Sequence, residues 1–476
     1  SGFTQWRPSV LREHASCTAV KTRQPGKSSQ TTAKPRRGTS SDADICTMLM
    51  ERVTSYELHA TPLQATHCTS QGHRGSTNIA VRIKCVRHRL PQQVRNAVHD
   101  ALRSGTLSSV AAAKRQSVDG VNAPEVAILG VGNCASSFVQ GIEYYSNPDN
   151  EDGLISDVIG GYKVSDIEIV AAYDINKSKV GKDLSEAIFA DPNNTIKFSD
   201  VPNTGIVVQP GVVNDGVGKF VKEIIETAPD SENFEDSLKK SGAEILINLL
   251  PVGSDDAVKF YAQSAINSNV GFINCIPVFI ARDNEWYQKF KDASVPLIGD
   301  DIKSQVGATI VHRVLAQLFS DRGVKLENTY QLNVGGNMDF LNMLEEDRLE
   351  TKRTSKTSSV TSVANKGSGI DEDNVRIGPS DYVKWLEDRK KAFIRLEGKA
   401  FGGAPLNIEV QLEVWDSPNS AGVTIDAVRY MKFFKENNDL ESLDLVSAWL
   451  MKAPFKAIKD GDVLNKLHEL THVESD

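Results

Sequence analysis

Cysteine is scarce in this chain, and long apolar runs are missing from it. Six of the 476 residues are cysteines, and only Cys134 and Cys275 lie beyond residue 122. Two cysteines do not suggest a disulfide framework, so we expect the larger part of the protein to be reduced and intracellular. No apolar run approaches the ~20 residues that a membrane-spanning helix needs. The sequence therefore predicts a cytoplasmic protein without membrane contact.

Acidic residues are scarce at the start of the chain and in excess after it. Residues 1–122 contain 18 Lys and Arg against 7 Asp and Glu, whereas the remaining residues contain 36 against 55. An acidic main part is a poor candidate for nucleic-acid binding. The first segment is rich in Ser and Arg, which is typical of a disordered extension or of a transit segment that directs a protein to an organelle such as a plastid. A basic tail that binds nucleic acid is a third interpretation.

A glycine motif follows the first apolar run of the main part. Residues 126–129 predict a buried strand, and Gly130, Gly132 and Ala135 then follow at the spacing G-x-G-x-x-A, before a segment at 138–145 that can be helical. In this strand–turn–helix context the motif predicts dinucleotide binding. Gly130 permits a tight turn, Gly132 lets a pyrophosphate approach the backbone, and Ala135 allows close packing of helix and strand. An ordinary strand–helix turn is the alternative.

A second predicted strand, residues 167–173, ends at Asp174. An acid at this point commonly binds the ribose hydroxyls, and its charge favours NAD over NADP because it would repel a 2′-phosphate. Asp174 lies 39 residues beyond Ala135, whereas the usual interval is about 20 residues. We attribute the excess to an inserted loop at 146–165. A helix N-cap before residues 177–184 is the alternative role for Asp174.

Strands and helices alternate in the segment that follows. Further strands are predicted at 244–250, 271–276 and 295–298, and a helix at 257–268 begins after a candidate N-cap, Ser254. This order predicts an α/β fold with a doubly wound parallel sheet, in which ligands bind at the carboxyl ends of the strands. The polar residues at those ends are Asn248, Asn274, Asp300 and Asp301.

A polar segment, residues 300–309, leads into a predicted helix at 308–319. Its side chains and backbone N–H groups could bind a phosphate at the helix N-terminus, and Lys303 adds a positive charge. A capped helix start with solvated polar residues is the alternative. Asp300 and Asp301 could instead bind a divalent cation, although two residues do not define a site. The candidate phosphate-binding residues are Ser304, Gln305, Gly307 and Thr309.

The pattern changes to strict alternation between about residues 325 and 414. Half-buried antiparallel strands are predicted at 330–334, 393–397 and 406–414, with a helix around 344–353 and a polar loop at 363–374. The sequence therefore predicts an inserted α+β domain, a kind of domain that often forms an oligomer interface. A helix at 423–435 then resumes the α/β pattern.

Seven motifs lie at residues 130–136, 250–254, 299–309, 333–343, 355–357, 412–420 and 450–454. Together they resemble the myo-inositol-1-phosphate synthase family, in particular its actinobacterial and archaeal branch. The resemblance covers about residues 124–455. It implies a homotetramer in which each chain has an NAD-binding Rossmann domain at 123–302, a catalytic and tetramerisation domain at 303–414, and a return to the Rossmann domain at 415–476.

The resemblance also implies a reaction, the conversion of D-glucose 6-phosphate to 1D-myo-inositol 3-phosphate with NAD used and regenerated in each turnover. The implied steps are oxidation at C5, removal of a C6 proton, aldol closure of C6 onto C1, and reduction at C5. A cation stabilises the enolate oxygen, and a lysine can also serve as acid or base. The resemblance assigns these roles to Lys303, Lys356 and Lys452. A divalent metal or a monovalent cation could assist.

Further site residues are implied by the same resemblance. Asp300 and Asp301 would flank the nicotinamide and the substrate, and Asn337, Met338 and Asp339 would line the sugar pocket. The expected cofactor-binding residues are Gly130, Gly132, Asn133, Cys134, Ala135, Asp174, Asn248, Pro251 and Asp416. Two other functions stay open: an NAD-dependent dehydrogenase of a phosphorylated sugar, and a non-catalytic NAD-binding regulator.

Overall fold

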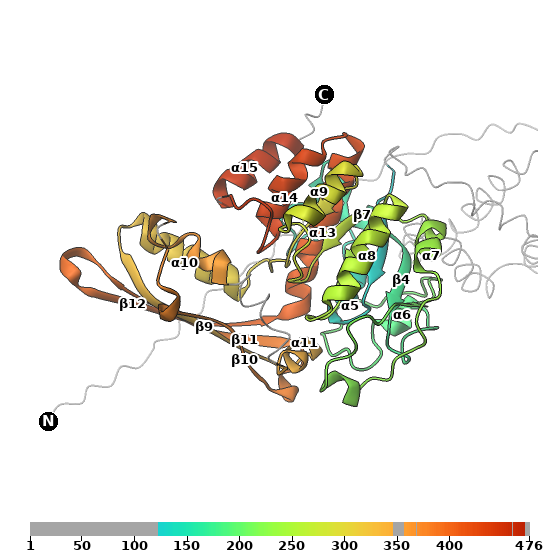
Figure 1. Ribbon diagram of the computed structural model, residues 1–476, viewed down its shortest axis with the longest axis horizontal. Helices are drawn as coiled ribbons and strands as arrows, with labels where there is room; N and C mark the ends of the chain where they lie inside the picture. The colour runs from blue at the N-terminus through green and yellow to red at the C-terminus, as the bar shows by residue number, and fades with distance from the viewer. Residues whose placement is uncertain (1–121, 346–356, 368, 459, 472–476) are drawn as a thin grey trace, which may run out of the picture. The chain divides into compact units, whose positions relative to one another are not determined.

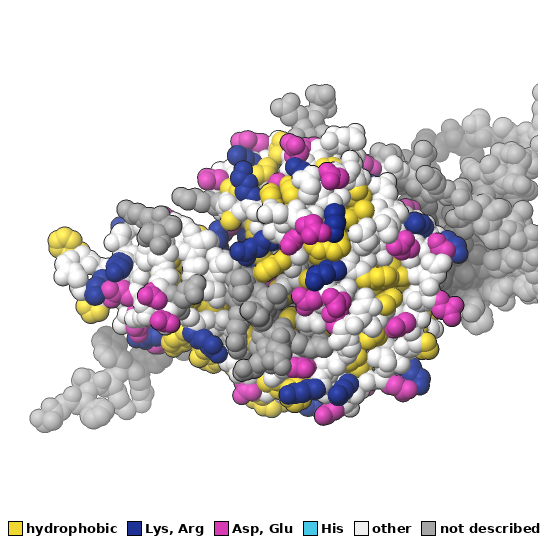
Figure 2. Space-filling view, in the orientation of Figure 1, with side chains coloured by type: hydrophobic (Ala, Val, Ile, Leu, Met, Phe, Trp, Pro, Cys, Tyr) yellow, Lys and Arg dark blue, Asp and Glu magenta, His cyan; other side chains and the backbone are white. Residues whose placement is uncertain are grey.

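The computed structural model describes residues 122–345, 357–367, 369–458 and 460–471 (Figure 1). Of the predicted extension at 1–122, only residue 122 lies within these ranges. Lys356 lies outside them. No helix in these ranges is long and apolar enough to cross a membrane. Figure 2 shows basic and acidic side chains interspersed on one face of the described surface, without a continuous basic area on that face.

Six parallel strands form the central sheet, in the order β5-β4-β1-β6-β7-β8. The chain enters in the middle, builds outwards to one edge, and then returns to build the other half. The strand order therefore reverses beside β1, which is where doubly wound sheets bind their ligands. The predicted Rossmann-type α/β fold is confirmed. The strands are β1 (Glu125–Leu129), β4 (Glu168–Asp174), β5 (Gln209–Pro210), β6 (Ile245–Asn248), β7 (Gly271–Asn274) and β8 (Leu297–Ile298).

Helices cover both faces of this sheet, which explains why β1 and β6 are continuous apolar runs rather than alternating ones. In β1, Val126 and Ile128 join one hydrophobic core, whereas Ala127 and Leu129 join the other. The first core is completed by α5 (Asn133–Tyr144), α6 (Leu184–Ala187), α13 (Asp416–Glu436), α14 (Leu443–Leu450) and α15 (Asp460–Thr471). The second is completed by α7 (Phe234–Ser241), α8 (Asp255–Ser268) and α9 (Asn284–Asp292).

The interval before Asp174 contains a small folded unit. A hairpin of β2 (Val158–Ile159) and β3 (Tyr162–Lys163) leads into η1 (Val164–Asp166). The fully buried Arg429 of α13 fixes it, since its guanidinium donates to the carbonyl oxygens of Ser156 and Asp157 at 3.0 and 2.9 Å. The alternative role of Asp174 as a helix N-cap is wrong, because the nearest helix, α6, is capped by Asp183.

A second sheet has the order β10-β9-β11-β12. Its strands are β9 (Lys325–Gly335), β10 (Val375–Tyr382), β11 (Arg389–Lys399) and β12 (Pro405–Trp415). The antiparallel pairing of β9, β11 and β12 agrees with the alternating pattern. The fourth strand, β10, was not predicted; its polar sequence contains Pro379, and it pairs in parallel with β9. Helix α10 (Ala308–Asp321) packs along one face of this sheet (Figure 1).

Several helices begin earlier than the apolar pattern predicts. Helix α5 begins at Asn133 rather than near 138, and α13 begins at Asp416 rather than at 423. Their first turns consist largely of polar residues, so hydrophobic periodicity could not mark them. Helix α11 (Met338–Asn342) was not predicted, and residues 344–345 of the expected helix at 344–353 are not helical. The short 3₁₀ segments are η2 (Val221–Glu223), η4 (Ala364–Gly367), η5 (Glu372–Asn374), η6 (Lys384–Leu386), η7 (Phe401–Gly403) and η8 (Leu440–Ser442).

Candidate active site

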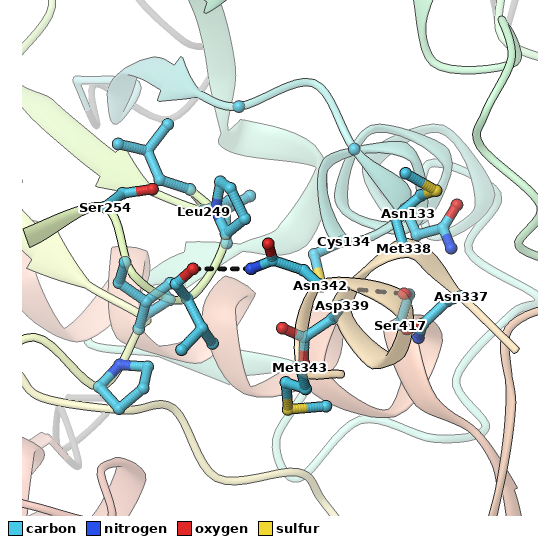
Figure 3. A pocket seen from close by; sticks show the side chains of 18 of the residues that line it. Asn133, Cys134, Leu249, Ser254, Asn337, Met338, Asp339, Asn342, Met343 and Ser417 are labelled. Atoms are coloured by element: carbon cyan, nitrogen blue, oxygen red, sulfur yellow. Dashed lines mark hydrogen bonds between the residues drawn. The ribbon is translucent and has the colours of Figure 1, made fainter. Parts of the chain in front are cut away.

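A cavity of about 340 Å³ lies at the carboxyl ends of the parallel strands and reaches the start of α10 and α11 (Figure 3). It brings together most of the predicted site residues. Those that line it are Gly130, Gly132, Asn133, Cys134, Asp174, Pro251, Asp301, Ser304, Gly307, Thr309, Asn337, Met338, Asp339, Asp416 and Lys452. Those among the described residues that do not line it are Ala135, Asn248, Asp300, Lys303 and Gln305.

The glycine turn forms one wall of the cavity. Gly130 has φ +85°, and a Cβ built there would lie 2.8 Å from the carbonyl oxygen of Leu249. A Cβ on Gly132 would meet no described atom within 4 Å, because this glycine faces the cavity. Within the described ranges no side chain caps α5 at Gly132. The first N–H groups of this helix therefore point to the space that a pyrophosphate would need.

Asp174 holds the turn from the end of β4. Its carboxylate accepts from the backbone N–H of Val131 and of Asn176, each at 2.7 Å. Lys179 supports the same turn by donating to the carbonyl oxygen of Val131 at 2.8 Å. Burial lowers the pKa of Lys179, and the nearby charge of Asp174 opposes that effect.

A buried carboxylate, Asp388, joins the glycine turn to the second sheet. Its Oδ1 accepts from Asn133 Nδ2 at 3.2 Å, from Asn337 Nδ2 at 2.9 Å and from Ser417 Oγ at 2.9 Å. All three partners lie at the cavity (Figure 3). Burial, together with the charge of Asp416, raises the pKa of Asp388. Sequence reasoning missed this residue, because its partners are far apart in the chain.

Asn248 and Asp300 form a chain of hydrogen bonds beneath the cavity. Asn248 Nδ2 donates to Asn274 Oδ1 at 2.8 Å, and Asn274 Nδ2 donates to Asp300 Oδ1 at 2.7 Å. Asp300 also accepts from three successive backbone N–H groups, at residues 280–282. Burial raises the pKa of Asp300 to about 7, although these hydrogen bonds lower it. Asn248 and Asp300 thus fix the conformation of the loop that follows β7.

Besides Lys179, two lysines line the cavity, and each of them is paired with a carboxylate. Lys452 Nζ donates to Asp301 Oδ1 at 2.7 Å and to the carbonyl oxygen of Ile302 at 2.6 Å. Lys390, at the start of β11, forms an ion pair with Asp416. Sequence reasoning missed Lys390, although a lysine at the end of an alternating strand near predicted site residues was an available signal. Each pair brings an ammonium group to the cavity lining.

Lys303 occupies a different place from the one the motif suggested. Its ammonium donates to the carbonyl oxygens of Ala448 and Trp449, both at 3.0 Å, and lies 3.4 Å from Asp460. Burial lowers the pKa of Lys303 to about 8. Gln305 is also directed elsewhere, since its Nε2 donates to the carbonyl oxygen of Gly153.

The remaining predicted ligands surround two helix N-termini. Ser304, Gly307 and Thr309 line the cavity at the start of α10, where the N-cap Gly307 offers no side chain to the described first turn. Asn337, Met338 and Asp339 line it at the start of α11 (Figure 3). Asn342 of that helix donates to the carbonyl oxygen of Val252 at 2.7 Å and so ties α11 to the Rossmann sheet. Asn333 and Gln331 of β9, not predicted, line the same region.

Metal-binding side chains do not cluster in the part of the chain that the structure describes. No group of three His, Cys, Asp or Glu there could hold a metal ion. The predicted assisting cation therefore stays a prediction. The fold and cavity define a Rossmann-type protein with space for a dinucleotide beside a second ligand.

Comparisons with known proteins identify the family. A family model described as Myo-inositol-1-phosphate synthase matches residues 307–417. The chain is 56% identical over 345 residues to an inositol-3-phosphate synthase from Mycolicibacterium smegmatis, covering 70% of this chain and 94% of that one. It is 52% identical over 357 residues to one from Corynebacterium glutamicum, covering 74% and 98%. The chain belongs to the myo-inositol-1-phosphate synthase family, as the motifs suggested.

A solved structure agrees at the level of the fold. The crystal structure of an inositol-3-phosphate synthase from Caenorhabditis elegans is 16% identical and superposes with a TM-score of 0.59, covering 75% of this chain and 90% of that one. The shared architecture therefore extends beyond the close bacterial relatives.

Proposed function

We propose that this protein is an inositol-3-phosphate synthase that converts D-glucose 6-phosphate to 1D-myo-inositol 3-phosphate. One observation carries the proposal: a single cavity joins a dinucleotide-type glycine turn to the start of α10, which no described side chain caps, and to two paired lysines. A dehydrogenase needs the first of these features. The other two suit a phosphorylated substrate on which negative charge develops during the reaction.

NAD fits the first part of the cavity. The open space over Gly132 and the free first turn of α5 suit the pyrophosphate, and Asp174 suits the ribose hydroxyls while repelling a 2′-phosphate. Bound NAD would supply the acceptor for the hydride of C5 and would return that hydride after ring closure. Asp388 accepts hydrogen bonds from Asn133 and Asn337 and so fixes both amide side chains between the space for NAD and the space for the substrate.

The substrate phosphate fits the start of α10. Ser304 and Thr309 offer hydroxyl groups there, and the backbone N–H groups after Gly307 offer further donors. The helix dipole adds a stabilising effect of about 0.3–1 kcal/mol for a charge at such a position. Anchored at this end, the sugar extends towards α11, where Asn337 and Asp339 can bind its hydroxyls.

The lysines supply the charge that enolisation requires. Removal of the C6 proton places negative charge on the C5 oxygen, and an ammonium group aimed at that oxygen stabilises the transition state more than the ground state. Lys452 and Lys390 line the cavity, so we assign this role to them. Asp301 and Asp416 keep both ammonium groups in place before the substrate binds. Lys356 lies outside the described residues and keeps its predicted role.

The test separates this reaction from simple oxidation. Purified protein is incubated with D-glucose 6-phosphate and less NAD than substrate, and inositol phosphate and NADH are both quantified. Inositol phosphate in excess of the NAD supplied supports the proposal. NADH accumulating in step with substrate loss, without inositol phosphate, would establish the dehydrogenase instead. NAD binding without turnover would establish the regulator.

A homotetramer is part of the proposal. The face of the second sheet opposite α10 exposes Leu332 and Phe393, which are paired across β9 and β11 and are 37% and 39% exposed. Ion pairs flank them, including Lys391 with Glu413 at 2.9 Å. An apolar centre with a charged rim is typical of a subunit interface.

A further inference from the structure

The segment that leads into α10 is held from outside the cavity by one side chain of α13. Asn419 Oδ1 accepts from the backbone N–H of Val306 at 3.1 Å, and Asn419 Nδ2 donates to the carbonyl oxygen of Val306 at 2.9 Å. A primary amide offers an acceptor and a donor side by side, so one asparagine can bind both backbone polar groups of a residue. The backbone adds a third contact, because Gln305 N donates to the carbonyl oxygen of Asn419 at 2.9 Å. Asn419 therefore fixes residues 305 and 306 through three hydrogen bonds.

Residues 305 and 306 lie between two parts of the proposed phosphate site. Ser304 precedes them and Gly307, the N-cap of α10, follows them, and both of these residues line the cavity. A Cβ built on Gly307 would lie 3.0 Å from Ser304 Oγ, so this hydroxyl group lies against the start of the helix. Residues 305, 306 and 419 are not among the described residues that line the cavity. The direction of the Ser304 hydroxyl relative to the first N–H groups of α10 thus depends on two residues that Asn419 holds from behind.

The side chain of Gln305 attaches the same segment to the folded unit that precedes β4. Its Nε2 donates to the carbonyl oxygen of Gly153 at 2.5 Å. A Cβ built on Gly422 would lie 2.8 Å from the amide carbon of Gln305, so this side chain crosses closely over α13. Gly153 precedes by three residues the first carbonyl oxygen that the buried Arg429 of α13 binds. Since both attachments of the segment lead to α13, we expect that the loss of the Asn419 amide would leave the segment folded and less ordered.

A phosphate site at a helix start requires donors that point to the same place. Without the Asn419 amide, the N–H and carbonyl groups of Val306 would bind water, and the segment would adopt several conformations. The apparent affinity for a ligand falls in proportion to the fraction of the protein that is in the binding-competent conformation. The bound complex itself would be unchanged, because the ligand selects the same arrangement of donors. The loss would therefore appear in ligand affinity and not in the rate of the bound complex.

We propose that Asn419 is a positioning residue, which acts through Val306 to hold Ser304 and the first turn of α10 in the arrangement that binds the substrate phosphate. This inference rests on the proposed function, since it takes the start of α10 as the phosphate site. Asn419 differs in this respect from its neighbours on α13 that line the cavity and can contact a ligand directly. These neighbours are Asp416, Ser417 and Ser420.

Asn419→Ala tests the proposal, with the exposed Asn437→Ala at the other end of α13 as the matched control. Two hydrogen bonds of ordinary strength correspond together to a factor of roughly ten or more, so we expect KM for D-glucose 6-phosphate to rise about tenfold. The kcat, the NAD affinity and the melting temperature should match those of the control. Calorimetric titration of the NAD-bound protein with inorganic phosphate gives a second measurement, in which the affinity should fall by a similar factor. Deuterium uptake by peptides covering residues 303–309 should become faster only in Asn419→Ala.

The outcomes separate this inference from the proposed function. If the wild-type protein forms no inositol phosphate, the proposed function fails, and the affinities of wild type and variant for inorganic phosphate still decide the role of Asn419. Equal phosphate affinities in Asn419→Ala and Asn437→Ala, including the absence of binding in both, would overturn that role. A higher KM without a loss of phosphate affinity would also overturn it, because the effect would then arise at the sugar. Parallel losses of phosphate affinity, NAD affinity and melting temperature would overturn it as well, because they would show a general structural role.

Discussion

Lys452 and Asp301 are joined twice, once through their side chains and once through their backbones. Nζ of Lys452 lies 2.7 Å from Oδ1 of Asp301, and its backbone N–H donates to the carbonyl oxygen of the same residue, also at 2.7 Å. The backbone contact fixes the separation of the two Cα atoms, so the ion pair forms without ordering a mobile segment. The ammonium group is therefore held in place before substrate binds, which is the arrangement that electrostatic catalysis requires.

Lys452→Met should abolish most of the turnover while leaving cofactor binding intact. The substitution keeps much of the side-chain length and removes the charge. Loss of one such electrostatic contact typically lowers kcat by about 100- to 1000-fold. Inositol phosphate formation and NAD binding are measured together, with Lys466→Met on the exposed side of α15 as the control. Turnover close to that of the control would remove Lys452 from the mechanism.

The two glycines of the cofactor turn should respond differently to alanine. Gly132→Ala places a methyl group in the cavity, where it meets no described protein atom, so we expect unchanged melting temperature and NAD affinity lowered about tenfold or more. Gly130→Ala places a Cβ against Leu249 at a positive φ, and we expect a stability loss of about 1–3 kcal/mol. Thermal melts with and without NAD distinguish the two effects. Equal losses of stability would contradict the assignment of Gly132 to the cofactor.

Asp174→Asn should weaken the preference for NAD over NADP. The amide keeps the shape of the side chain and removes the charge that would repel a 2′-phosphate. It also replaces one of the two oxygens that accept from the backbone N–H groups of Val131 and Asn176, so the melting temperature is measured as well. A hydrogen bond to a charged group contributes about 1.5–3 kcal/mol, so NAD affinity should fall about tenfold or more while NADP affinity falls less. Calorimetric titration of both nucleotides provides the measurement, with the exposed Asp200→Asn as the control. An unchanged ratio of the two affinities would exclude Asp174 from ribose recognition.

The parts that the sequence predicted well are those in which local pattern and tertiary packing agree. Strands β1, β6 and β7 are uninterrupted apolar runs because both sheet faces are covered, so their hydrophobicity alone indicated them. The start of α5 was not predicted because Ser136 and Ser137, in its first turns, are polar residues although they are buried. Hydrophobic periodicity carries no signal for such positions.

The site residues that escaped prediction depend on contacts between distant segments. Asp388 and Asn133 are 255 positions apart, and only the folded chain brings them together. Lys303 shows a second reason why sequence patterns do not predict every site contact. Its motif fixes its place in the chain, but Asp301 has φ +62°, so the regular alternation of side chains does not continue from Asp301 to Lys303. The motif therefore indicated the segment, and the catalytic role of Lys303 stays a prediction.

His312 should make the protein sensitive to acid. It is fully buried between Thr329 and Gln331, and burial lowers its pKa from 6.5 to about 4. Between these values the unfolded chain binds a proton that the folded protein does not, so stability is lost as pH falls from 6.5 to about 4, by up to about 3 kcal/mol. His312→Gln should be less stable at neutral pH and show a shallower decline over this window. Melting temperatures across the window give the comparison, with the exposed His468→Gln as the control; parallel declines in wild type and His312→Gln would contradict the assignment.

Phe393→Lys should dissociate the proposed tetramer without unfolding the subunit. The side chain lies on the face of the second sheet opposite the α10 core, so a charge there can stay in solvent in an isolated subunit. Burying a phenylalanine side chain stabilises an interface by about 1.5–3 kcal/mol. Because a symmetric interface contains two copies, the dissociation constant should rise by roughly 100-fold or more. Light scattering after size-exclusion chromatography reports the mass, and Val207→Lys, at an exposed position of the Rossmann domain, is the control. A tetramer that persists at low concentration in Phe393→Lys would show that the subunits associate through another surface.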